Sequence, residues 1–323
     1  MSGRFNNRLL LWIFLGLAAV FVITRVTRVR KTERTLRTEL AEIDTSRVST
    51  LLIYPRAEQD NELTFNREEG SWSVSGTEAT APANRDMVRN TLSELQNLEI
   101  EQLVARSAGN WGDYGVSDSL GTRVVVREGD KTVMDLVVGR FHYQPAPQGY
   151  NMYGQNRGTG KTYIRLSGEE EVYLADGFLA MSINQPFNRW RDQTVTRLNT
   201  SALSRIICDY PADSGFIAQK TDTGWLVGGL PADSASMASY LTGVAGKTHS
   251  GFADGFRPSG EPDFRITFEG DNMPAHTVQA FRQTDTTLVL GTTFNPDSWF
   301  RVDRDGLFEE VFPSASGLLA EGE

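Results

Sequence analysis

The feature of this chain that most restricts its fold is an internal duplication. Residues 43–53 and 198–208 carry apolar and polar side chains in the same order, and each leads into a pair of strand-like segments. The second strand of each pair contains a tryptophan two positions before a valine, at Trp72 and Trp225. Because side chains alternate between the two faces of a strand, the tryptophan and the valine share one face in each copy. We therefore expect Trp72 and Trp225 to occupy equivalent strand positions.

The match continues beyond these strands. Asn84 and Asp233 each precede a segment with apolar side chains at helical spacing, and both are suitable N-caps. The later matches are residues 122–130 with 263–271, which share a Glu-Gly-Asp triplet, and residues 163–166 with 299–302. The triplet predicts a tight hairpin turn in both copies. We expect an α+β protein with two tandem, β-rich, mostly antiparallel units, each with one helix. The alternative is one larger domain whose hairpins match by coincidence.

An apolar run near the N-terminus predicts a membrane anchor. Residues 9–23 contain no charged or strongly polar side chain. At about 1.5 Å per residue they span about 22 Å, and flanking apolar residues and snorkelling arginines extend the crossing toward a bilayer core of about 30 Å. A cleaved signal peptide and a buried core helix are the alternatives, but basic residues rather than a small-x-small cleavage site follow the run. We expect contact with the lipid bilayer through residues 9–24.

The segment after the anchor predicts a stalk. Val29, Leu36 and Ile43 recur every seven residues with no Pro or Gly between them, which favours a helix over a solvated linker. The expected parts of the chain are an N-terminal tail and transmembrane anchor over residues 1–24, a basic helical stalk over residues 25–42, a first α+β unit over residues 43–190 and a second over residues 191–323.

Composition and motifs argue against several classes of function. The net charge of −9 argues against nucleic acid as the main partner. The single cysteine, Cys208, allows neither an internal disulfide nor a cysteine-based metal site. Residues 154–162 lack the spacing of a phosphate-binding loop, and residues 303–306 favour a turn between strands over a calcium loop. We predict no catalytic, cofactor-binding or metal-binding residues, and we expect a protein that is not an enzyme.

The connection over residues 141–161 is the most informative loop. It is longer and more aromatic than residues 281–297, its expected counterpart in the second unit. Loops of this length are usually functional or disordered, and exposed Tyr and Arg side chains are typical anchors of interfaces. The alternative is a loop folded back on its own sheet. The candidate partner-binding residues are Phe141, Tyr143, Tyr150, Tyr153 and Arg157.

Four features together resemble a known bacterial family, the domain-of-unknown-function 4340 family, over about residues 43–300. They are the N-terminal anchor, the Gly-x-Trp strand followed by a short capped helix, Tyr114-Gly115-Val116, and Trp190-Arg191-Asp192. The resemblance implies a membrane-anchored protein whose globular part lies outside the cytoplasmic membrane. It also implies association with ABC-type transport systems, including systems related to gliding machinery. The family has no defined catalytic residues, so none is carried over to this chain.

The basic residues beside the apolar run and the family resemblance predict opposite orientations of the globular part across the membrane. Six basic residues follow the apolar run, at Arg25, Arg28, Arg30, Lys31, Arg34 and Arg37. The positive-inside rule therefore places the body in the cytoplasm. The short basic N-terminal tail and the resemblance favour the extracytoplasmic side, which we predict for a single-pass protein of the inner, or cytoplasmic, membrane.

The expected function is that of a non-enzymatic accessory or binding protein. Its expected partners are membrane subunits of an ABC-type transporter at the cell envelope. A module that binds envelope glycan and a hydrolase with unrecognised carboxylates are the alternatives.

Overall fold

The computed structural model describes residues 43–145 and 159–319. The expected anchor and stalk lie outside the described residues. The described residues divide into two compact units, one within residues 1–70 and 86–186 and the other within residues 71–85 and 187–323. The domain boundaries expected from the repeat stay a prediction. Within the described ranges, no helix has both the length and the apolar character needed to cross a bilayer.

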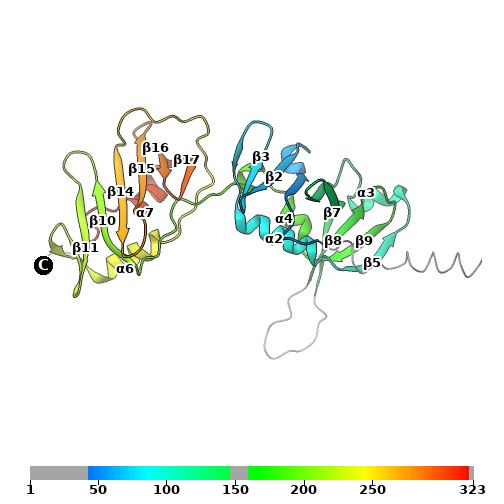
Figure 1. The fold of residues 1–323 in the computed structure, drawn as a ribbon, viewed down its shortest axis with the longest axis horizontal. Coiled ribbons are helices and arrows are strands. Elements are labelled where there is room, and N and C mark those ends of the chain that lie inside the picture. The colour runs from blue at the N-terminus through cyan, green and yellow to red at the C-terminus, as the bar shows by residue number, and fades with distance from the viewer. Residues whose placement is uncertain (1–42, 146–158, 320–323) are drawn as a thin grey trace, which may run out of the picture. The chain divides into compact units, whose positions relative to one another are not determined.

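The first sheet has nine strands in the order β4-β3-β2-β1-β6-β7-β8-β9-β5. Their bounds are β1 (Thr50–Tyr54), β2 (Leu63–Glu68), β3 (Ser71–Ser75), β4 (Thr80–Pro82), β5 (Ile100–Ala105), β6 (Thr122–Glu128), β7 (Lys131–Gln144), β8 (Thr159–Leu166) and β9 (Val172–Asp176). The helices of this part are α2 (Arg85–Gln96), α3 (Trp111–Tyr114), α4 (Leu179–Ile183) and the 3₁₀ turns η1 (Arg56–Glu58) and η2 (Ala108–Asn110). In Figure 1, β7, β8 and β9 lie side by side.

The second sheet has eight strands in the order β13-β12-β11-β10-β14-β15-β16-β17. Their bounds are β10 (Leu203–Asp209), β11 (Phe216–Thr221), β12 (Gly224–Val227), β13 (Leu230–Pro231), β14 (Phe264–Gly270), β15 (His276–Arg282), β16 (Thr287–Thr292) and β17 (Asn295–Asp303). The helices are α5 (Phe187–Trp190), α6 (Ser234–Val244), α7 (Glu309–Val311) and the kinked turn η3 (Arg304–Phe308). The predicted β-rich, antiparallel α+β class is confirmed.

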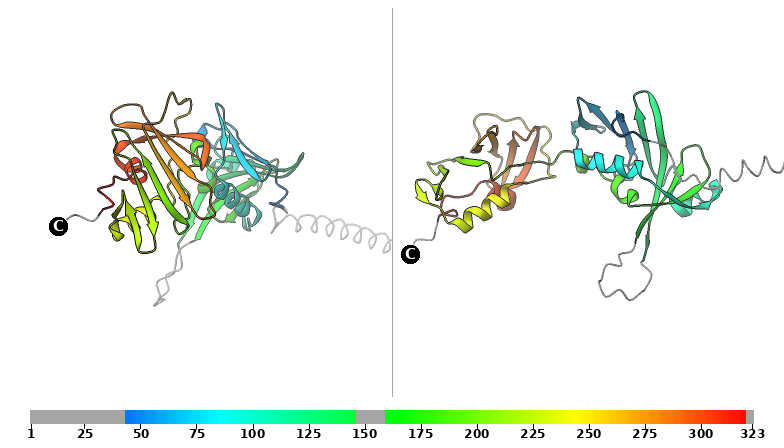
Figure 2. Two further views of the ribbon diagram at one scale, coloured as in Figure 1. Left: turned by 60° about the vertical axis from the view of Figure 1, so that its left-hand side comes forward. Right: turned by 60° about the horizontal axis from the view of Figure 1, so that its bottom comes forward.

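The hydrophobic pattern explains why these segments form these elements. Leu51 and Ile53 on β1 and Val124 and Val126 on the neighbouring β6 are fully buried. Leu52 and Val125 between them are also buried, so these continuous apolar runs form central strands that are covered on both faces. On α2 the buried side chains follow helical spacing, at Val88, Thr91, Leu92 and Leu95. Figure 2 shows α2 in cyan and α6 in yellow, each lying against strands of its own sheet.

The repeat is visible in the order of elements. In each half four strands precede the long helix and four further strands follow it, with β5 as an additional edge strand of the first sheet. The N–H of Ala83 donates to the carbonyl of Trp72 at 2.8 Å, and the N–H of Ala232 donates to that of Trp225 at 2.9 Å. The two tryptophans thus share one strand position, as expected, and both are partly rather than fully buried.

The caps and turns of the repeat agree only in part with the expectation. Asp233 caps α6, because its Oδ1 accepts the N–H of Ser236 at 2.7 Å. The first Glu-Gly-Asp triplet forms the expected tight turn, with Glu128 paired to Lys131. The expectation is wrong for the second triplet, because β14 continues to Gly270 and the last paired residues are Phe268 and His276.

The final match of the predicted repeat is also wrong. Residues 163–166 lie on β8, which corresponds by sheet order to β16, whereas residues 299–302 lie on β17, which corresponds to β9. Neighbouring strands of one sheet bury the same face, so a similar pattern recurs on both and sequence similarity alone does not separate them. The counterpart of the long β7–β8 connection is therefore the short turn between Arg282 and Thr287.

Candidate functional site

The long hairpin of β7 and β8 presents an aromatic surface. Phe141 pairs with Thr162 across the hairpin, and Tyr143 pairs with Gly160. Two residues apart on one strand, Phe141 and Tyr143 project on the same face. The ring of Phe178 stacks on Phe141, with 5.5 Å between the ring centroids. A Cβ on Gly160 would lie 2.6 Å from Phe178, so glycine leaves the space that this ring fills.

This surface is exposed to solvent. The exposed fractions are 55% for Tyr143, 52% for Phe178 and 54% for Met181, which are three of the six large exposed hydrophobic side chains among the described residues. The N–H of Met181 donates to the carbonyl of Phe178 at 2.8 Å, which places Met181 one turn along α4. We call Phe141, Tyr143, Phe178 and Met181 the aromatic face. Exposed apolar side chains gathered in this way are typical of a binding surface.

Hydrogen bonds to the side chain of Glu94 on α2 hold the backbone of Phe178 in place. One carboxylate oxygen of Glu94 accepts the N–H of Phe178 at 2.9 Å, and the other accepts the hydroxyl of Ser182 at 2.9 Å. The hydroxyl of Thr162 donates to the carbonyl of Gly177 at 3.1 Å. The backbone that carries the exposed ring is therefore fixed from both sides, as suits an interface anchor.

The other face of the hairpin holds a buried ammonium group. The side chain of Lys161 is only 5% exposed; its Nζ pairs with Glu101 and lies 3.2 Å from Asp176. The hydrogen bond that Lys161 donates to Glu101, together with its pairing with Asp176, raises the pKa of Lys161, although burial acts in the opposite direction. Lys161 thus stays protonated and serves as a structural cation. Lys161 lies on β8, within the segment that lacks the spacing of a phosphate-binding loop, and no local motif in the sequence indicates its carboxylate partners.

A depression of about 690 Å³ borders the aromatic face at Phe178. Its described lining comes from one side of α2 and from the adjoining ends of β8 and β9, at Asn90, Ser93, Glu94, Asn97, Glu99, Thr159, Gly160, Asp176, Gly177 and Phe178. Among these residues are three acids and neither Lys nor Arg. The depression therefore combines carboxylates and amides with one aromatic ring.

The predicted site residues divide into two groups. Phe141 and Tyr143 lie together on the aromatic face, but on strand β7, which continues to Gln144, rather than in the expected loop. Tyr150, Tyr153 and Arg157 lie outside the described residues. Phe178 and Met181 were not predicted, because β9 and α4 return them to the hairpin from a distant part of the sequence. The one local indication in the sequence is Gly160, which pairs with Tyr143 and leaves room for the ring of Phe178.

A second depression lies in the second unit and was not predicted. It has a volume of about 1310 Å³ and an aromatic floor that includes Tyr210, Phe264, Phe308 and Phe312. The hydroxyl of Tyr210 donates to the carbonyl of Pro313 at 3.1 Å. Beneath this floor, burial raises the pKa of the Cys208 thiol to about 12, so the thiol is neutral and unreactive at physiological pH. No motif connects these residues in the sequence.

Other candidate motifs are structural. Residues 303–306 do not form the expected turn between strands, because β17 ends at Asp303 and the chain enters η3, where Gly306 has φ of 108°. Within the described ranges no group of three or more His, Cys, Asp or Glu side chains is arranged to hold a metal ion. Arg191 is buried, stacks over Phe252 at 3.5 Å and forms a bidentate pair with Asp254 at 2.7 and 2.8 Å.

These observations define a tandem α+β protein whose first unit carries an exposed aromatic face beside an acidic depression. The family model described as Domain of unknown function (DUF4340) matches residues 72–267, more than half of the chain, and the chain belongs to this family. No curated protein and no solved structure gives a match.

Proposed function

We propose that this chain is a membrane-anchored, non-enzymatic accessory protein that binds a membrane subunit of an ABC-type transport system at the cell envelope. The observation that carries the proposal is the aromatic face, where three exposed apolar side chains stand on a fixed backbone. Aromatic side chains of this kind supply a large share of the binding energy in protein interfaces.

The sequence supports a place for this protein at the inner membrane. The apolar run over residues 9–23 would anchor the chain in the inner membrane, and residues 43–323 would lie on the extracytoplasmic side. The aromatic face belongs to the first unit, which follows the anchor and stalk in the chain. The long β7–β8 hairpin has only a short turn as its counterpart in the second unit, and such divergence between copies favours a function for the hairpin.

A second candidate function is the binding of envelope glycan. The depression places the side chains of Asn90, Ser93 and Asn97 beside the exposed ring of Phe178. Amide and hydroxyl groups next to an aromatic ring are suited to a sugar, whose hydroxyls form hydrogen bonds and whose C–H face packs on the ring.

Capture from solubilised membranes tests the proposal. A full-length variant with Tyr143→Ser, Phe178→Ser and Met181→Ser removes the exposed anchors but leaves the core intact. We expect it to retain about a tenth or less of the transporter subunit that the wild-type chain captures. The matched control is Ile217→Ser with Leu230→Ser, which changes two exposed apolar side chains of the second unit.

The outcomes separate the two functions. Equal capture by the wild type and the triple variant contradicts the proposed role of the aromatic face. Specific retention on a glycan array that is lost in Asn90→Ala with Asn97→Ala, while no transporter subunit is captured, favours the glycan-binding function instead.

A further inference from the structure

The acidic depression beside the aromatic face indicates which kind of partner segment would dock there. Glu94 and Glu99 line the depression, and Asp176 stands at its edge. Among residues 43–145 and 159–319, the carboxylate of Glu94 accepts hydrogen bonds from two uncharged donors, the N–H of Phe178 and the hydroxyl of Ser182. Each carboxylate offers about four acceptor positions, so Glu94 keeps acceptor capacity after these two bonds.

The nearby cation does not neutralise this charge. Lys161 pairs with both Glu101 and Asp176, so two carboxylates share one ammonium group. The ammonium is also buried, whereas Glu99 is exposed at the depression. The described surface around Phe178 is therefore negative, and an anionic lipid surface would be repelled from it.

Two arginines elsewhere in the molecule stack on an aromatic ring and pair with a carboxylate, and they indicate which group would complete the site at Phe178. The guanidinium of Arg165 lies 3.9 Å from the ring centre of Trp111 and pairs with Asp118. Arg191 stacks in the same way over Phe252 and pairs with Asp254. In both cases an arginine joins an aromatic ring to a carboxylate, which its planar, charged head group suits.

Phe178 and its neighbouring carboxylates repeat two parts of this arrangement. The ring is 52% exposed, the carboxylate of Glu94 holds its backbone, and no arginine of the described residues stacks on it. We infer that the partner supplies the third part: its docking segment carries arginine beside apolar side chains, with the guanidinium stacked on Phe178 and paired to Glu94 and Glu99. This inference rests on the proposed function and specifies the chemistry of the partner at the same surface.

Peptide binding to the full-length chain tests the inference. The chain is placed in nanodiscs of phosphatidylcholine, and fluorescent peptides of equal length and apolar content are titrated at 50 mM salt. One peptide carries three arginines, and a second carries three citrullines at the same positions, which keep the shape but lack the charge. We expect the arginine peptide to bind at least tenfold more tightly, with weaker binding at high salt.

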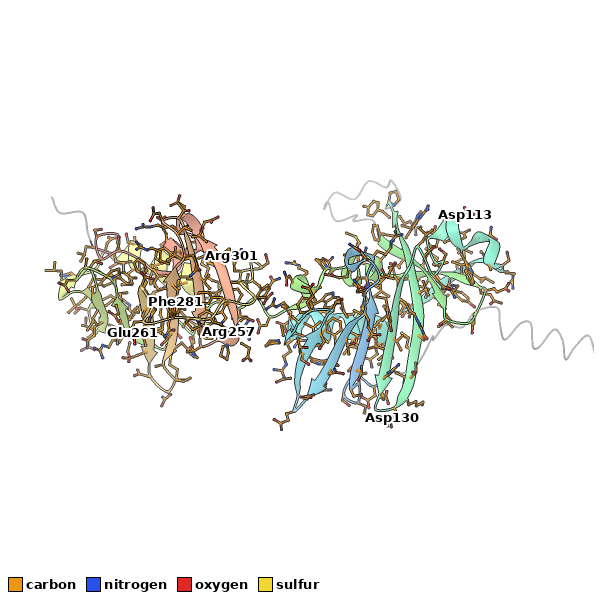
Figure 3. The ribbon with its side chains drawn as sticks, turned by 90° about the horizontal axis from the view of Figure 1, so that it is seen from above. Asp113, Asp130, Arg257, Glu261, Phe281 and Arg301 are labelled. Carbon is orange, nitrogen blue, oxygen red and sulfur yellow. The ribbon has the colours of Figure 1, made fainter. Side chains whose placement is uncertain are left out.

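Matched charge variants locate the binding. Ser93→Lys with Glu99→Lys places two cations in the depression and is expected to weaken binding of the arginine peptide at least tenfold. The control is Asp130→Lys with Thr132→Lys, which makes the same change in net charge at the opposite end of β7. A strand rises by about 3.3 Å per residue, so the two control positions lie about 40 Å from Tyr143 along β7. Figure 3 marks Asp130 at the end of its hairpin. This control should bind like the wild type.

Two results overturn the inference. One is equal binding of the arginine and citrulline peptides, and the other is equal weakening by the two lysine variants. If transporter capture is lost with Phe178→Ser but unchanged with Ser93→Lys and Glu99→Lys, the aromatic face binds a partner that is not cationic. In that case the proposed function stands and only the inference on arginine fails. If capture is unchanged in both, the proposed function fails as well.

Discussion

Replacing Trp190 with alanine is expected to lower the free energy of unfolding by about 3–5 kcal/mol, as for other fully buried aromatic side chains. Trp190 ends α5 and is completely shielded from solvent. Its carbonyl accepts the N–H of Asn84 at 2.7 Å, so the backbone around the resulting cavity is tied down and cannot readily collapse. Urea unfolding followed by circular dichroism measures the change.

Trp225→Ala provides the comparison for this prediction. Trp225 is only partly buried at the edge of the second core, so its loss should cost less, about 1–2 kcal/mol. If the two variants had equal free energies of unfolding, the greater burial of Trp190 would not explain its contribution to stability, and the prediction would be wrong.

Gly139→Ala is expected to destabilise the first unit by about 2–3 kcal/mol. A Cβ at this position would meet the carbonyl oxygen of Tyr114 and would lie 2.6 Å from a methyl group of Val116. The oxygen belongs to the backbone and cannot rotate away, so the Tyr114-Gly115-Val116 segment would have to move from β7. Gly115 adopts φ of 70° at the end of α3, which restricts how this segment can adjust.

Gly243→Ala is the matched control for Gly139→Ala. Gly243 lies within α6, and a Cβ there would meet no heavy atom within 4 Å apart from its chain neighbours and the backbone of the same helix. Alanine is the better helix former, so we expect this variant to gain about 0.5–1 kcal/mol in thermal or urea unfolding. Changes of the same sign in the two variants would contradict the close approach of Gly139 to Tyr114.

The sequence predicts the repeated strands well because each half alternates apolar and polar side chains around the same turns. The oxygen of Asp44 accepts the hydroxyl of Ser46 at 2.6 Å, and that of Asn199 accepts the hydroxyl of Ser201 at 2.7 Å, so both copies begin with the same turn. The matches fail later, where β14 extends past the expected turn and where neighbouring strands share one hydrophobic pattern. These features depend on strand pairing, which periodicity does not specify.

Half of the aromatic face could be predicted from the sequence. Phe141 and Tyr143 belong to one conspicuous aromatic segment, and their spacing on a strand places them on one face. Phe178 and Met181 could not be assigned to it, because the pairing of β8 with β9 and the hydrogen bonds of Glu94 return them to the hairpin. The acidic depression likewise draws residues from α2, β8 and β9, and no linear motif contains them.

The most direct test of the account is photo-crosslinking from Tyr143 in living cells. The full-length chain carries p-benzoylphenylalanine in place of Tyr143, and a control chain carries it in place of Thr132, at the opposite end of the same strand. We expect irradiation to join position 143, but not position 132, to a membrane subunit of an ABC-type transporter. Phe178→Ser in the same chain should abolish the adduct. Absence of that subunit from the adducts at position 143, or equal adducts at both positions, would contradict the aromatic face as the docking site.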